Sequence, residues 1–161
     1  MGEKQVQTYY KRLAIKIIID TNIAFSAILN SSGRIGKLLL LNQHFGFYSC
    51  EFLKFELHKH KKKLLGLTKY SEFLLNELEQ DVLSNIQFKD ETLIPENHLL
   101  LAEKIAFDVD PDDIPFVDLT MYLDGFLWTG DKKLIEGLKQ KGFMQTITTA
   151  ELSDLFDQLE G

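Results

Sequence analysis

Acidic side chains are concentrated in one stretch of the sequence, VDPDDIPFVDLTMYLDGFLWTGDKKL (residues 109–134). Counting Asp108 just before it, six aspartates fall within 17 residues, and a seventh follows at Asp131. Like charges held together in a fold repel, so the crowding indicates that the acids face a cation. Sites built only from oxygen ligands select hard ions, which predicts Mg²⁺ or Mn²⁺ rather than zinc.

Short apolar runs that end at aspartates predict where two of these acids lie. AIKIIID (14–20) suits a strand buried on both faces of a parallel sheet, and it ends at Asp20. DGFLWTGD (124–131) is a second such strand and ends at Asp131. Further strands are expected at 44–49 and 143–148. The helices are expected at 21–29, 35–42, 51–65, 71–86, 96–107, 114–123, 132–142 and after the capping box TTAE (148–151).

Alternation of strands with helices predicts the fold class, α/β. We expect a three-layer α/β/α sandwich around a central parallel sheet of four to five strands. Within the helix expected at 71–86, an apolar stripe at spacing four should face the core: Leu74, Leu78, Val82 and Ile86. Asp112 or Asp113 can cap the helix that follows them.

Four acids that are remote in sequence should meet at one edge of this sheet. Asp20 and Asp131 end strands, Glu56 lies within two turns of a helix start, and Asp113 lies at another helix start. Right-handed connections carry helix starts to the carboxyl edge of a parallel sheet, where ligands bind in such folds. The pattern therefore predicts one acidic site.

Composition excludes some classes of protein and leaves others open. A net charge of −6 and a pI near 5.2 argue against a protein that grips nucleic acid by bulk positive charge. Basic residues do cluster in HKHKKK (58–63) and at residues 132, 133, 139 and 141, either as solvated helix faces or as a guide for RNA.

Length and local composition predict organisation and location. The chain of 161 residues suggests a single domain over 15–161 with an N-terminal extension over 1–14. The extension lacks the apolar segment of a signal peptide, and no apolar run is long enough for a membrane helix. The lone Cys50 agrees with a reducing compartment, so we expect a cytoplasmic protein without membrane association.

Other acid-containing motifs fit the sequence poorly. An EF-hand beginning at Asp108 would place Asp113 and Leu119 where that loop needs glycine and glutamate. A haloacid-dehalogenase phosphotransferase needs a second acid at position 22, which is Asn22, and a receiver domain needs paired acids after the first strand. GRIGK is too short for a phosphate loop, and His58 and His60 are too closely spaced for a zinc motif on a helix.

Three blocks together resemble the PIN-domain nuclease family. They are IIIDTNIAFSAIL (17–29), YSCEFLKFELHKH (48–60) and PDDIPFVDLTMYLDGFLWTGDKKL (111–134), in family order over roughly residues 15–152. Thr120, where the family commonly has alanine, and Cys50, where it often has proline or serine, depart from the pattern.

The resemblance implies roles for individual residues. It assigns the catalytic and metal-binding positions to Asp20, Glu56, Asp113 and Asp131, with Asp112 as the next candidate beside Asp113. Asn22 and Thr129 flank the acids and can support them by hydrogen bonds to a carboxylate or a bound water; helix capping is the alternative for Asn22. Asp118 should lie off the acidic face and meet solvent.

The activity implied is that of a metal-dependent endoribonuclease, which uses Mg²⁺ or Mn²⁺ and leaves 5′-phosphate and 3′-hydroxyl ends. Small members of the family resemble VapC-like toxins of type II toxin–antitoxin modules, which implies an antitoxin protein as a partner and favours a homodimer. RNA, single-stranded or structured, is the expected substrate. Two alternatives stay open: a non-catalytic PIN-like binding domain acting through a protein or RNA partner, and a phosphatase-like hydrolase.

Overall fold

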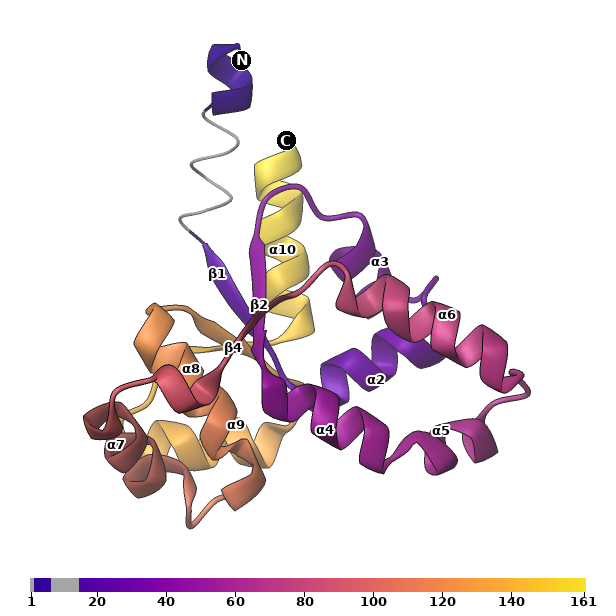
Figure 1. Ribbon diagram of the computed structural model, residues 1–161. Coiled ribbons are helices and arrows are strands. Elements are labelled where there is room, and N and C mark those ends of the chain that lie inside the picture. The colour runs from indigo at the N-terminus through magenta and orange to yellow at the C-terminus, as the bar shows by residue number, and fades with distance from the viewer. Residues whose placement is uncertain (1, 7–14) are drawn as a thin grey trace.

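The computed structural model describes residues 2–6 and 15–161 (Figure 1). The extension expected over residues 1–14 therefore falls largely outside the described residues, of which only 2–6 belong to it; residues 3–6 are helical.

A parallel sheet of five strands forms the centre of the fold, in the order β3-β2-β1-β4-β5. Its middle strand is the apolar run KIII, whose three isoleucines are fully buried, as expected for a strand covered on both faces. The predicted α/β sandwich is confirmed. The strands are β1 (Lys16–Ile19), β2 (Gly46–Cys50), β3 (Gln87–Lys89), β4 (Phe126–Trp128) and β5 (Thr146–Ile147).

Helices cover both faces of this sheet. In Figure 1, α7 and α8 lie to the left of the strands, and α2, α3 and α6 lie to the right. The helices are α2 (Thr21–Leu29), α3 (Arg34–Leu40), α4 (Glu51–Lys59), α5 (Lys61–Leu67), α6 (Glu72–Leu83), α7 (Glu96–Ala106), α8 (Ile114–Leu123), α9 (Lys132–Gln140) and α10 (Thr149–Glu160), with short 3₁₀ turns at Glu91–Leu93 (η1) and Pro111–Asp113 (η2).

Three local expectations are corrected by the structure. The helix expected over 51–65 is broken at His60, whose backbone leaves the helical region (φ −99°, ψ 9°), so that α4 and α5 are separate. On α6 and just after it, the expected inward positions Leu78, Val82 and Ile86 are buried or partly buried, but Leu74 is 41% exposed and Leu75 is fully buried in its place. β3 was missed because its three residues at the sheet edge form no buried apolar run.

Asp118 is buried, contrary to the expectation that it meets solvent. Its side chain is 2% exposed, and Oδ1 has no hydrogen-bond partner within the part of the chain that the structure describes. Burial raises the pKa of this carboxyl to about 6, the charge of His98 on α7 lowers it and that of Glu103 raises it. The expectation was wrong because it used only the rotation along α8, whereas the packing of α7 on α8 determines the burial.

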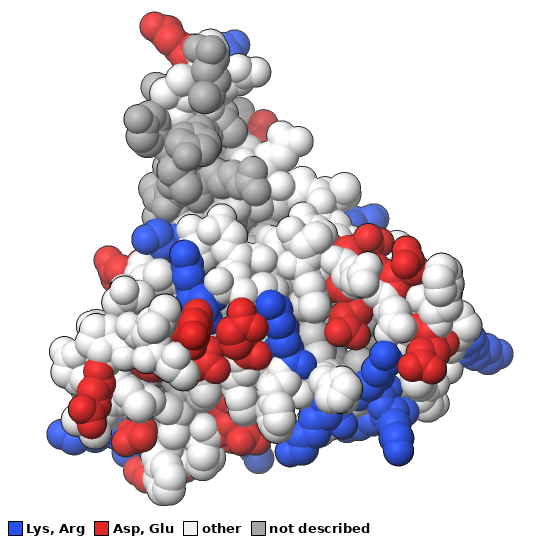
Figure 2. All heavy atoms as spheres, viewed as in Figure 1, with Lys and Arg blue, Asp and Glu red and all other residues white. Residues whose placement is uncertain are grey.

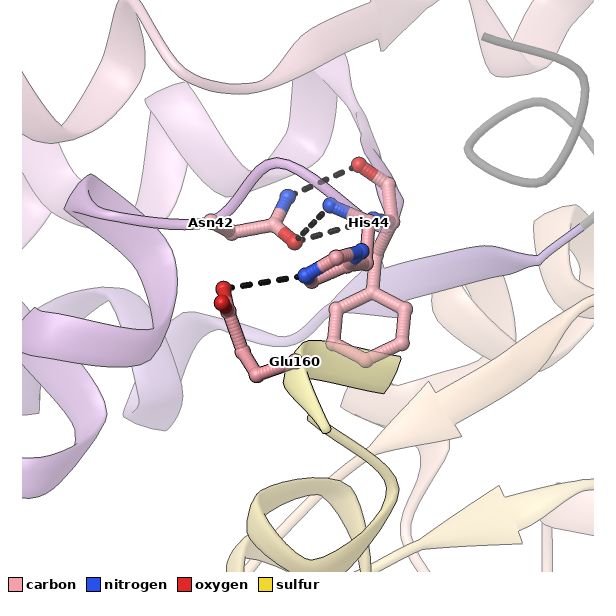
Figure 3. Close-up of polar contacts among 4 residues, drawn as sticks. Asn42, His44 and Glu160 are labelled. Atoms are coloured by element: carbon pink, nitrogen blue, oxygen red, sulfur yellow. Dashed lines mark hydrogen bonds and ion pairs between the residues drawn. The ribbon is translucent and has the colours of Figure 1, made fainter. Parts of the chain in front are cut away.

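A polar cluster fixes the turn that leads into β2 (Figure 3). The Asn42 amide donates to the Phe45 carbonyl at 2.8 Å, and its Oδ1 accepts from the backbone N–H groups of His44 and Phe45 at 2.8 and 2.9 Å. His44 Nε2 lies 3.0 Å from Glu160 Oε1 at the end of α10. The cluster thereby joins the last helix to the start of a core strand.

In the described residues, no helix combines the length and the apolarity that a membrane span requires.

We expect Asn42→Ala to lower the free energy of unfolding by about 1–3 kcal/mol, because it leaves two backbone N–H groups and a carbonyl without their partner. Glu160→Gln should lower it by less than about 1 kcal/mol, since the side chain of Glu160 is half exposed. Urea denaturation of both variants measures the difference, and equal losses would contradict this account of the turn.

Asp118 should make stability depend on pH. Because the folded protein holds this proton more tightly than the unfolded chain (pKa 3.8 raised to about 6), the unfolding free energy rises as pH falls from about 7 to 4. Asp118→Asn should therefore stabilise the protein by about 1 kcal/mol at pH 8 and by much less at pH 4. Denaturation at both pH values checks this, with the exposed Glu136→Gln as control; a constant effect of Asp118→Asn would refute it.

Candidate active site

Two neighbouring strands bring Asp20 and Asp131 to the same edge of the sheet. β1 and β4 pair in parallel with Ile19 opposite Trp128, and each acid follows its strand. Each then occupies the N-cap of the next helix: Asp20 Oδ1 accepts from the Ile23 N–H at 2.8 Å, and Asp131 Oδ1 accepts from the Leu134 N–H at 3.1 Å. Capping satisfies free N–H groups of α2 and α9 and fixes both carboxylates.

Glu56 and Asp113 reach this edge from helices. Glu56 lies on α4, where its Oε1 accepts a 2.7 Å hydrogen bond from the Thr21 hydroxyl. Asp113 precedes α8 but accepts no capping hydrogen bond, whereas Asp110 caps the preceding 3₁₀ turn through the Asp112 N–H at 3.0 Å. Asp110 caps this turn in place of Asp113, so the carboxylate of Asp113 accepts no capping hydrogen bond from a backbone N–H group.

One pocket of about 320 Å³ is lined by all four acids that the sequence singled out. Asp112, the next candidate, also lines it, and so does Asp110. The remaining lining residues come from α2, α5, α8 and α9 and from the break between α4 and α5: Thr21, Asn22, Phe25, Leu29, His60, Lys63, Leu64, Leu67, Phe116 and Leu134.

Burial and mutual repulsion make two of the carboxyls hard to ionise. Burial raises the pKa of Asp20 to about 6; the hydrogen bonds from Ile23 and Thr129 lower it, and the charges of Asp131 and Glu56 raise it. Burial raises the pKa of Asp113 to about 7, helped by the charges of Asp110, Asp20, Asp131 and Glu56. The acids therefore act on one another as a single electrostatic cluster.

A divalent cation fits the chemistry of this cluster. Within residues 2–6 and 15–161, none of Asp20, Glu56, Asp113 and Asp131 forms an ion pair with a lysine, arginine or histidine. In the same residues, no three His, Cys, Asp or Glu side chains are arranged as a ready ligand set. Mg²⁺ does not need one, because it keeps several waters and takes one or two carboxylates directly.

The supporting residues behave differently from one another. Thr129 is fully buried, hydrogen-bonds Asp20, and accepts from the Asp131 N–H at 3.2 Å, so it links the two strand-end acids. Asn22 lines the pocket but is exposed. Thr21 was missed by the sequence analysis, although it lies between Asp20 and Asn22 in the same motif.

In the part of the chain that the structure describes, neither Cys50 nor the histidines belong to a group of side chains that could hold a metal ion. Cys50 is fully buried, which raises the pKa of its thiol to about 12, the opposite of an activated cysteine. His60, expected at the surface, is half buried and lines the pocket, while His58 is exposed.

Comparisons with known proteins identify the fold. The chain is similar to one in the crystal structure of VapBC2 from Rickettsia felis bound to a DNA fragment from their promoter, with a TM-score of 0.62 and 14% identity over 83% of this chain and 98% of that one. No curated protein sequence matches the chain. The family model described as PIN domain matches residues 18–153, which contain the whole acidic pocket. The chain belongs to the PIN domain family.

Proposed function

We propose that the protein is a metal-dependent endoribonuclease that hydrolyses RNA phosphodiesters with Mg²⁺ or Mn²⁺. The observation that carries the proposal is the convergence of Asp20, Glu56, Asp113 and Asp131 in one pocket, where none of them forms an ion pair with another described side chain. PIN domains are generally nucleases and typically use divalent metals, which agrees with this donor set.

Each acid contributes differently to such a site. Asp20 and Asp131 each use one carboxylate oxygen to cap a helix, and Asp20 also accepts a hydrogen bond from Thr129, so both carboxylates are held on a rigid support and keep lone pairs for a metal. Asp113 has no capping role, and Glu56 would exchange or share its contact with Thr21. Asp20, Glu56, Asp113 and Asp131 would hold a divalent ion, which would make an attacking water more acidic and neutralise charge on the phosphate and the leaving oxygen.

The acids also explain why the site needs the cation to accept its substrate. An uncompensated cluster of carboxylates repels an RNA phosphate, at about 1 kcal/mol per pair of unit charges at 4 Å in water and more in a partly buried site. With a divalent ion bound, the same pocket attracts phosphate. We therefore expect RNA binding at the pocket to depend on the metal.

We further propose that the protein is the toxin of a type II toxin–antitoxin module, with an antitoxin as partner, in the cytoplasm. Its fold is similar to that of a chain in a solved VapBC2 complex, which supports this. Large apolar side chains that are exposed on the described surface provide contacts for such a partner or for a homodimer: Phe55, Leu67 and Phe73 near α4 to α6, and Leu99, Leu100, Phe107 and Tyr122 on or next to α7 and α8. We take residues 15–161 as one nuclease domain.

Asp20→Asn should reduce RNA cleavage in Mn²⁺ by at least about 100-fold, because it removes a charged ligand from the centre of the cluster. Asp108→Asn is the matched control: Asp108 lies outside the pocket and pairs with Lys141 at 2.8 Å. Cleavage of labelled RNA with Mn²⁺ or EDTA measures the effect. Equal cleavage by Asp20→Asn, or cleavage in EDTA, would trace the activity to a contaminant and defeat the assignment.

Mn²⁺ should raise the melting temperature by roughly 5–10 °C at a concentration 100-fold above its Kd, because it binds only the folded cluster. The rise should be larger at pH 8 than at pH 6, since protons compete for Asp20 and Asp113, whose pKa values are raised. The double variant Asp20→Asn/Asp113→Asn should lose the response. If wild type shows neither a thermal shift nor calorimetric heat with Mn²⁺, the protein is instead a non-catalytic binding domain.

A further inference from the structure

Besides the acids, the pocket is lined by a group of basic and apolar side chains. It combines a lysine, a histidine and an aromatic ring with three leucines, from α2, α5 and the break between α4 and α5: Phe25, Leu29, His60, Lys63, Leu64 and Leu67. Two of the acids come from the same elements, because Asp20 directly precedes α2 and Glu56 lies on α4, before His60; in Figure 1, α2, α4 and α5 lie on the right. The same cavity therefore holds the acids together with basic and apolar side chains.

Lys63 differs from the other lysines of the HKHKKK run. Lysines gather over α4 and α5 at the lower right of Figure 2, but of this run only His60 and Lys63 line the pocket. Lys61 lies 3.5 Å from Glu72 on α6, and Lys62 is exposed outside the pocket. Lys63 forms no ion pair with another described residue, so its ammonium group is available to a ligand.

Phe25 and His60 form an aromatic edge in the same pocket as this lysine. Their rings are 6.0 Å apart at an interplanar angle of 80°, and both side chains are half buried. Leu29 and Leu67 extend the apolar surface within the same pocket. A small inorganic anion would gain nothing from this surface, whereas a nucleobase can stack on aromatic side chains and pack against leucines.

We propose that Lys63 binds a backbone phosphate next to the scissile one, and that the Phe25–His60 wall receives the adjoining nucleobase. The inference rests on the nuclease function proposed above and makes it more specific. A base enters such a pocket only when it is unstacked and unpaired, so the site takes a nucleotide from a single-stranded segment. Lys63 and Phe25 are thus substrate-binding residues distinct from the acids that hold the metal.

The lysine is tested by steady-state cleavage of a single-stranded RNA oligonucleotide with Mn²⁺. Lys63→Ala should raise KM by roughly 5- to 20-fold with kcat nearly unchanged, because the contact is made equally in the ground and transition states. The slope of log kcat/KM against log salt should fall by about 0.7, the value for one phosphate contact to a single strand. Lys62→Ala, one position away on α5, should match wild type, and Lys63→Arg should restore most of the affinity.

The base pocket is tested with oligonucleotides that lack one base at successive positions around the cleavage site. In wild type, removal of one particular base should raise KM by roughly 5- to 100-fold, the range for loss of a base stacked on an aromatic ring. Phe25→Leu keeps an apolar side chain without the ring, and it should make KM insensitive to that base. If wild type shows no such position, or if Phe25→Leu leaves the sensitivity unchanged, the base pocket is wrong.

The outcomes separate this inference from the proposed function. Metal-dependent cleavage by wild type with the same KM and salt slope for Lys63→Ala and Lys62→Ala would overturn the inference alone. If Lys63→Ala binds Mn²⁺ more tightly but RNA as wild type does, the ammonium group only balances the acids, which also overturns it. Absence of cleavage by wild type would overturn both. Lys63→Gln keeps the aliphatic stem, so a loss shared by Lys63→Ala and Lys63→Gln is due to the charge.

Discussion

The backbone N–H groups at the starts of α2 and α9 hold two carboxylates where the site needs them. Asp20 and Asp131 follow adjacent parallel strands, and each caps the helix that comes next, with hydrogen bonds of 2.8 and 3.1 Å. The same contacts stabilise the helix starts, which carry partial positive charge. Formation of the sheet therefore also places these two acids. Thr129 links them, because it hydrogen-bonds the Asp20 carboxylate and accepts from the Asp131 N–H.

This arrangement accumulates charge that the fold itself does not neutralise. Burial and neighbouring acids raise the pKa of Asp20 to about 6 and that of Asp113 to about 7. Repulsion of this kind destabilises the protein unless protons or a cation share the pocket. A structural role would favour replacing such groups by apolar side chains, so their retention in one cavity is better explained by a ligand than by stability.

Asp118 is a buried acid that lies outside this cluster. It lies on α8, one and a half turns beyond Asp113, and faces α7 instead of the pocket. Its Oδ1 has no hydrogen-bond partner among the described residues, which lowers the stability of the fold, and the side chain does not line the acidic pocket. The cluster at the sheet edge and this isolated acid therefore affect different properties of the molecule, ligand binding in one case and the stability of the α7–α8 contact in the other.

Apart from β3 and the break between α4 and α5, the sequence alone determined the order of the strands and helices, the four candidate acids and the capping box at Thr148, because these depend on residues close to one another along the chain. Only the tertiary structure decided that Asp118 is buried, that Thr21 holds Glu56, and that Lys63 lines the pocket while Lys61 pairs with Glu72. Those facts depend on how remote helices pack against each other. A periodic pattern gives the face of a helix, but the neighbour that covers this face is set by the whole fold.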